Sequence, residues 1–218
     1  MTETPADELN WPKQGEKLFR DDFLDWQHTG YAGGEPRDIS QWNRYVEGYR
    51  TAADLVVAGV VGQAPRGQFD LVLHPVVFLY RHHFELALKT VVLLGRRYFD
   101  EKDDVPIGHG LMGLWREARR LLEKRWPDRD REVDDTVARL LGELDGFDPK
   151  GTAFRYPDTK DGQTSFPGGV AANVRHFAEV AGRVGNYLMS CITGLWCELD
   201  LKETFLSDMR SMFGDEVW

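Results

Sequence analysis

Residues 69–98 read FDLVLHPVVFLYRHHFELALKTVVLLGRRY, and they are the most informative part of this sequence. Apolar side chains occupy nearly every side of this run when it is drawn as a helix. A helix of that kind is stable only when other elements cover it all around. The run therefore predicts a long central helix that is buried inside a bundle of other helices.

Shorter segments with apolar residues at helical spacing lie on both sides of this run. Further helices are expected at residues 16–26, 41–61, 111–126, 133–144, 170–199 and 202–213. Ser40 is expected to cap the helix at 41–61. The alternation of strands and helices that is typical of a parallel sheet is absent. The sequence thus predicts an all-α helical bundle.

One segment departs from the helical pattern. Residues 154–157 read FRYP, residues 158–162 are polar and end in a glycine, and residues 163–166 read QTSF. Two short runs around such a turn are typical of a β-hairpin. We therefore expect one small β-hairpin inserted into the bundle.

The composition is that of a folded, acidic chain. Of its 218 residues 42% are apolar and 29% are charged, and the net charge is -9. This length suffices for one domain with a sizeable core. Proteins that bind duplex DNA usually carry a basic face, so the charge argues against generic DNA binding. It leaves open an RNA contact through a local basic groove.

The termini and the cysteines indicate how the chain is organised. Residues 1–13 are polar and acidic, without an apolar signal region, and are expected to form a flexible tail before a single helical domain at residues 14–218. No segment reaches the roughly 18 apolar residues of a membrane span. Cys191 and Cys197 lie close together on one predicted helix, which indicates a reducing compartment. The expectation is a cytoplasmic protein that does not contact membranes.

A narrow polar stripe runs along the predicted central helix. At about 100° per residue it comprises His74, Arg81, His82, Glu85 and Lys89. In one interpretation, Arg81 with Glu85 and Glu85 with Lys89 form i,i+4 pairs in a purely structural network. In the other, the stripe lines a crevice where Arg81 and Lys89 bind an anion and His82 exchanges protons.

The histidines give little support for a metal site. His83 points away from His82 and is expected to be a core histidine with one hydrogen-bond partner. His82 and Glu85 are at i,i+3 but lack further ligands nearby. Cysteine clusters and the HExxH, EF-hand, Walker A and GxGxxG motifs are absent from the sequence. We therefore expect neither a metal nor a cofactor.

Two further segments contain candidate binding residues. His109 lies between two glycines just before a predicted helix, where it could contact a phosphate or cap the helix. Arg155 and Tyr156 lie in the predicted hairpin, and the planar fork of arginine suits a phosphate or a carboxylate. The alternative is that Arg155 pairs with Asp158 or with Glu85.

Three short segments, taken in order, resemble HEPN-like proteins, the "higher eukaryotes and prokaryotes nucleotide-binding" helical family. They are RHHFELALK at 81–89, GHGL at 108–111 leading to Leu114 and Trp115, and FRYP at 154–157. The resemblance implies a helical bundle that dimerises so that two protomers form one cleft. Many members of the family are metal-independent RNases of toxin–antitoxin, CRISPR and anti-phage systems, and others are non-catalytic binding or assembly proteins.

The catalytic signature of that family is an arginine, four to six residues, and then a histidine. No arginine of this chain has that spacing: Arg20 and His28, like Arg66 and His74, are separated by seven residues. The resemblance then implies an alternative site. Its catalytic residues would be Arg81, His82 and His109, and its substrate-binding residues Glu85, Lys89, Arg155 and Tyr156.

Two functions follow as expectations. The first is a HEPN-like protein that binds or cleaves RNA in a toxin–antitoxin or anti-phage role, acting as a metal-independent endoribonuclease if it is an enzyme. It predicts a positive cleft that joins the stripe, His109 and Arg155. The alternative is a non-catalytic helical module that binds a protein or a nucleotide, and it predicts that these charges cancel within each protomer.

The C-terminal residues 199–218 carry many large apolar side chains, including Leu201, Phe205 and Met212. Such a surface must dock on the body of the protein or on another chain. With the resemblance, this predicts a homodimer and leaves room for a further protein partner such as an antitoxin.

Overall fold

The structure is a computed structural model that describes residues 12, 14–19, 23–35, 38–63, 68–102 and 104–213. Contacts divide the chain into two compact units, Met1–Gly34 and Glu35–Trp218. The flexible tail expected at residues 1–13 lies outside the described residues, except for Pro12. The single domain expected at residues 14–218 stays a prediction.

The first unit contains a short 3-10 helix, η2 (Phe23–His28). Of the helix expected at 16–26, residues 16–19 are not helical and residues 20–22 lie outside the described part. Asp25 interrupts the regular helical pattern within η2. Its backbone angles are not helical, its carboxylate accepts a hydrogen bond from His28 Nδ1, and its carbonyl accepts one from the Thr29 hydroxyl. Such local side-chain bonds compete with the regular helical pattern.

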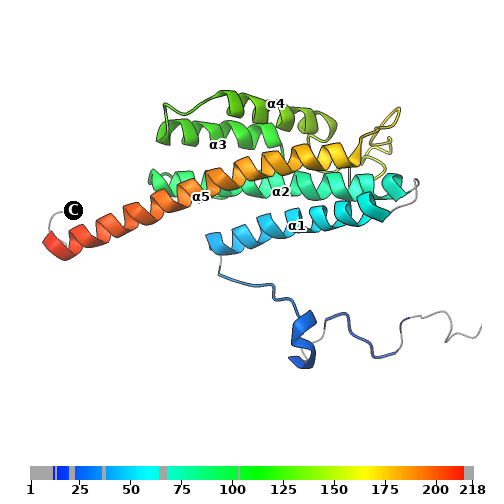
Figure 1. Cartoon of the computed structure of the whole chain (residues 1–218), viewed down its shortest axis with the longest axis horizontal. Coiled ribbons are helices and arrows are strands. Elements are labelled where there is room, and N and C mark those ends of the chain that lie inside the picture. Colours follow the sequence, from blue (N-terminus) through cyan, green and yellow to red (C-terminus); the bar gives the residue numbers. More distant parts are fainter. Residues whose placement is uncertain are drawn as a thin grey trace, which may run out of the picture. The chain divides into compact units, whose positions relative to one another are not determined.

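The second unit is a helical bundle, so the all-α prediction is confirmed (Figure 1). In its described part the helices are α1 (Ile39–Gln63), α2 (Gln68–Tyr98), α3 (Leu111–Arg125), α4 (Glu132–Phe147) and α5 (Val174–Phe213). Helix α2 packs against α1, α3 and α5, and α4 packs mainly against α3. The predicted central helix is therefore confirmed.

The core lies along α2, where every residue from Ala87 to Gly95 is buried. Gly95 lets α3 approach closely, because a Cβ atom there would lie 2.9 Å from the Cβ of Leu121. No helix in the described part of the chain is long and apolar enough to cross a membrane.

Helix α1 is capped by Asp38 and not by Ser40. The Asp38 carboxylate accepts hydrogen bonds from the Ser40 amide at 2.8 Å and from the Ser40 hydroxyl at 2.6 Å. These bonds hold the pKa of Asp38 below its usual value. Because both residue types are good N-caps, the sequence alone did not distinguish them.

The two helices expected at 170–199 and 202–213 form one helix, α5, of 40 residues. Asp200 and Leu201 lie at the expected break, and neither is a helix-breaking glycine or proline. The helix begins later than expected, at Val174, because the Asn173 side chain accepts a hydrogen bond from the His176 amide at 3.0 Å. Figure 1 shows the C-terminal end of α5 projecting beyond the other helices.

The expected β-hairpin is wrong. Residues 154–166 form a loop with one isolated antiparallel bridge, between Asp158 and Thr164. The amides of Arg155 and Tyr156 are already bonded to the Thr152 carbonyl in a turn. The next residue is a proline, which has no amide to donate to a strand ladder.

Candidate functional site

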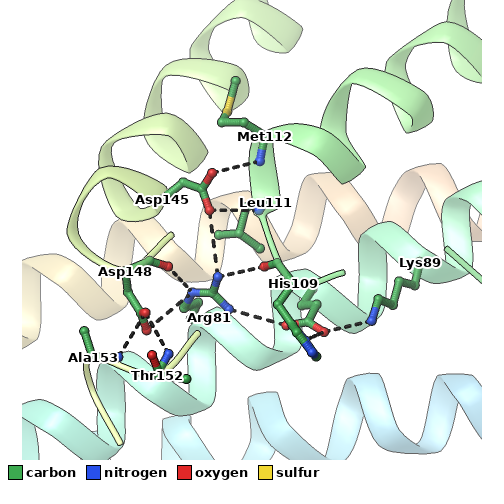
Figure 2. Close-up of polar contacts among 10 residues, drawn as sticks. Arg81, Lys89, His109, Leu111, Met112, Asp145, Asp148, Thr152 and Ala153 are labelled. Carbon is green, nitrogen blue, oxygen red and sulfur yellow. Dashed lines mark hydrogen bonds and ion pairs between the residues drawn. The ribbon is translucent and has the colours of Figure 1, made fainter. Parts of the chain in front are cut away.

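Arg81 lies at the centre of a buried polar network (Figure 2). Its side chain is 2% exposed, and it donates to the carbonyls of His109 at 2.7 Å and Asp148 at 3.1 Å. Its guanidinium is 3.4 Å from Glu85 Oε2, 3.6 Å from Asp148 Oδ2 and 3.8 Å from Asp145 Oδ1. The charge of Arg81 is therefore compensated within the chain.

Asp145 reaches this network from the last turns of α4 and also caps α3. Its carboxylate accepts hydrogen bonds from the amides of Leu111 at 2.9 Å and Met112 at 3.3 Å. The first amides of a helix lack partners within the helix and carry a positive partial charge. Asp145 thus joins the start of α3 to the end of α4, and Arg81 ties both to α2.

Asp148 orders the loop that follows α4. Its Oδ1 atom accepts hydrogen bonds from the amides of Thr152 at 2.7 Å and Ala153 at 3.0 Å. Gly151 precedes these two residues with a φ of 71°, and a Cβ there would lie 2.6 Å from Arg81 Nη1. The loop can therefore close over Arg81 only with glycine at this position.

Glu85 links the buried network to the surface. Its Oε1 atom accepts from Lys89 Nζ at 2.9 Å and from His109 Nδ1 at 2.8 Å. The predicted pairs of Glu85 with Arg81 and with Lys89 are both present. Burial alone would raise the pKa of Glu85, but the hydrogen bonds from Lys89 and His109 hold it below its usual value. Glu85 is therefore ionised at neutral pH.

His109 is the accessible member of this group, since its side chain is 65% exposed. Because a carboxylate can only accept, the bond to Glu85 places a proton on Nδ1 and leaves Nε2 as the basic atom. Nε2 has no partner among the described residues. An imidazole held by a buried carboxylate, with its other nitrogen open, is an arrangement used in general acid–base chemistry.

His82 lies apart from this network, on the side of α2 that faces α1. Its ring stacks on Phe78 at 5.8 Å and meets the edge of Tyr49 at 4.3 Å. Burial lowers the pKa of His82, the Glu85 charge opposes that effect, and the Lys89 charge adds to it. His82 is therefore neutral at pH 7.

An aromatic pocket of about 300 Å³ opens beside His82. It is lined by Gln41, Trp42, Tyr45, Tyr49, His82 and Leu86. The three aromatic residues of α1 are at i, i+3 and i+7, so they share one face of the helix. The sequence did not lead us to predict this pocket, although the helical spacing of the three aromatic residues within 41–61 indicates that they share a face.

Arg155 and Tyr156 are exposed on the loop. The guanidinium lies 5.5 Å from the centre of the Phe78 ring and 5.2 Å from that of Tyr156, and it donates to the Tyr156 hydroxyl at 3.3 Å. The alternative pairing with Asp158 or Glu85 is not formed in the described structure. Arg155 thus remains available to an external anion.

The structure brings four of the predicted site residues into one cluster and separates the other three from it. The cluster contains Arg81, Glu85, Lys89 and His109, whereas His82 lines the aromatic pocket and Arg155 and Tyr156 lie on the loop. Among the described residues, no group of three or more histidines, cysteines or acidic residues could hold a metal ion.

Comparisons of this chain with models of protein families, with curated proteins and with solved structures gave no match.

Proposed function

We propose that this protein is a HEPN-like RNA-binding protein that takes an unpaired base into the aromatic pocket. The main support for this proposal is the pocket itself, because Trp42, Tyr45 and Tyr49 present aromatic side chains in one concave site. Unstacked bases bind proteins by stacking on such side chains, at about 1–3 kcal/mol per base.

The polar groups of the pocket suit the edge of a base. The side-chain amide of Gln41 has two N–H donors and an oxygen acceptor. The ring of neutral His82 has one N–H donor and one nitrogen acceptor. A volume of about 300 Å³ accommodates a single base and excludes a duplex. These features support recognition of single-stranded RNA or of a free nucleotide.

Arg155 is the proposed contact for the phosphate next to the bound base. It is exposed, has no ion pair among the described residues, and stands over the Phe78 ring that stacks on His82. Arginine forms paired hydrogen bonds with phosphate oxygens. The whole chain carries a net charge of -9, which repels further phosphates. We therefore expect the RNA contact to extend over only a few nucleotides around Arg155.

For cleavage, the proposed proton-transferring residue is His109, with Glu85 and Lys89 as the groups that position it. Nε2 of His109 would accept the proton of a ribose 2′-hydroxyl, whose oxygen then attacks the adjacent phosphorus without a metal ion. The bond from phosphorus to the 5′-oxygen of the next nucleotide breaks, and that oxygen takes a proton from water. The products are a 2′,3′-cyclic phosphate and a 5′-hydroxyl. Glu85, which binds His109, lies three positions after His82 on α2, so one helix carries residues of both proposed sites. Arg81 has a structural role in this scheme.

The second candidate function is a non-catalytic module that binds a nucleotide or a protein. The closed network around Arg81 favours it, because the charges of Arg81 and Glu85 are compensated inside one chain. Incubation of a mixed RNA pool with the protein in EDTA separates the two functions. Cleavage that is lost in His109→Ala supports the enzyme, and intact RNA supports the binding module.

We also propose that the protein is cytoplasmic and that it acts in a toxin–antitoxin or anti-phage system. Cys191 and Cys197 are both free thiols, which supports a reducing compartment. We also propose a homodimer, because Leu201, Phe205 and Met212 lie exposed on one face of the projecting end of α5. That face could equally receive a protein partner such as an antitoxin.

RNA binding is tested by the fluorescence anisotropy of a labelled single-stranded 12-nucleotide RNA. Trp42→Ala and Tyr49→Ala should each weaken binding about tenfold, because each removes one stacking surface. Trp196→Ala is the matched control, since Trp196 is an exposed aromatic residue of α5 outside the pocket. Equal affinities for all four proteins would refute the proposed role of the pocket.

A further inference from the structure

A second and larger cavity lies on the other side of α2, and we call it the apolar pocket. It has a volume of about 670 Å³. Its walls come from α2, α4, α5 and residues 154–173, and the apolar side chains that line it include Leu73, Val77, Phe84, Leu144, Phe154 and Phe177. Its volume falls within the range of about 300–1,000 Å³ that is usual for small-molecule sites.

The position of α4 explains why this cavity exists. Helix α4 packs mainly against α3, so a gap remains between α4 and the pair α2 and α5. The apolar pocket and the aromatic pocket share no residue. At about 100° per residue, Leu73, Val77 and Phe84 lie on the face of α2 opposite His82 and Leu86. The apolar pocket is therefore a separate site.

The rim of the apolar pocket carries positive charge. Arg139 from α4 and Arg183 from α5 line it, together with His176. Glu143 faces Arg139 at 3.9 Å, but both side chains are about two-thirds exposed, so the pair is weak. Arg183 has no hydrogen bond or ion pair among the described residues. Two arginines against one glutamate make the rim cationic in a chain of net charge -9.

We propose that the apolar pocket binds a small amphipathic anion, with its hydrocarbon chain among Leu73, Phe84 and Leu144 and its anionic group between Arg139 and Arg183. Burial of the chain supplies the affinity, because it removes apolar surface of both partners from water. The two arginines select an anion, since each can form paired hydrogen bonds with a carboxylate or a phosphate.

Isothermal titration of the full-length protein tests this site with four 12-carbon probes below their micellar concentrations. Laurate and dodecyl phosphate carry the two candidate anionic groups, dodecanol is neutral, and dodecyltrimethylammonium is cationic. We expect saturable binding of at least one anion, at least about tenfold tighter than that of the neutral or cationic probe. The tighter of the two anions identifies the head group.

Two variants locate the binding. Arg139→Glu/Arg183→Glu should weaken binding of the anion at least about tenfold, because it reverses both rim charges. Arg116→Glu/Arg210→Glu is the matched control, since both of these arginines are exposed and outside the pocket. Val180→Trp, which fills the pocket from α5, should abolish binding while the thermal midpoint shows that the protein stays folded.

Three results would overturn the proposal. The first is the absence of saturable binding of either anion to the wild-type protein. The second is equal affinity in the rim variant and in its charge-matched control. The third is binding that survives in folded Val180→Trp.

Discussion

Arg81 shows how a single residue can hold three helices together. It contacts Glu85 on its own helix, Asp145 at the end of α4, and the His109 carbonyl just before α3. All of these groups compensate a charge that water does not reach. We therefore infer that Arg81 stabilises the packing of α3 and α4 against the central helix.

Replacing Arg81 should cost stability. Arg81→Met leaves Asp148 buried without its cation and leaves Glu85 with Lys89 and His109 alone. Breaking a buried ion pair typically costs about 3–5 kcal/mol. Urea unfolding measures the effect, and Arg116→Met, at an exposed position of α3, should change the free energy of unfolding by less than about 0.5 kcal/mol. Similar small effects of both substitutions would contradict a structural role for Arg81.

His83 should make the stability of the protein depend on pH. It is fully buried, its Nδ1 donates to the Val46 carbonyl at 2.9 Å, and its Nε2 has no partner. Burial lowers the pKa of His83 to about 4, from 6.5. The unfolded chain therefore binds more protons than the folded one between these values, and stability falls as the pH falls through that window.

The expected loss is about 2–3 kcal/mol between pH 7 and pH 4.5. It is measured as the difference in free energy of unfolding between wild type and His83→Gln at the two pH values. Glutamine can still donate to the Val46 carbonyl but does not titrate. If the two proteins lose the same stability on acidification, His83 is not the group responsible.

At the scale of elements, helical periodicity predicted most of the bundle. The expected helices at 111–126 and 133–144 correspond to α3 and α4, because their apolar residues recur on one face. The loop at 154–166 and the length of α5 were not predictable in this way. The loop depends on hydrogen bonds to the Thr152 carbonyl and to Asp148, which the sequence pattern does not reveal.

Contacts between the residues of the candidate site were predictable only within α2. The pairs of Glu85 with Arg81 and Lys89 follow from i,i+4 spacing. Asp145 and Asp148 lie more than 60 positions from Arg81, and their roles depend on how α4 packs. The aromatic pocket likewise needs α1 and α2 side by side before His82 can meet Tyr49.

The close contact of α2 with α3 gives a prediction about glycine. Gly95→Ala should destabilise the protein by about 1–3 kcal/mol, because the new methyl group would overlap Leu121. Gly182→Ala in α5 is the matched control, since a Cβ there meets nothing within 4 Å. It should stabilise the protein by about 0.5–1 kcal/mol through helix propensity. Thermal unfolding distinguishes them, and stabilisation by both would show that α2 and α3 are not in close contact.

At the scale of the bundle, α2 separates two pockets of different chemistry. The aromatic pocket lies towards α1, and the apolar pocket lies towards α4 and α5. The end of α5 continues past this body with Leu201, Phe205 and Met212 exposed at 65%, 61% and 73%. An apolar face of this kind is typical of an interface between chains.

The homodimer is tested by light scattering after size-exclusion chromatography at micromolar concentration. We expect twice the chain mass of 25.0 kDa for the wild type and the monomer mass for Phe205→Glu. Leu55→Glu, which changes an equally exposed leucine of α1, should remain dimeric. A wild-type protein that elutes at the monomer mass would refute the dimer.

RNA binding through the aromatic pocket is tested most directly by photo-crosslinking of a single-stranded RNA that contains 4-thiouridine, with mass spectrometry of the attached peptide. We expect attachment at Trp42, Tyr45 or Tyr49, and its loss when an excess of unlabelled RNA is added. Attachment confined to other parts of the chain, or none at all, would contradict RNA binding through the aromatic pocket.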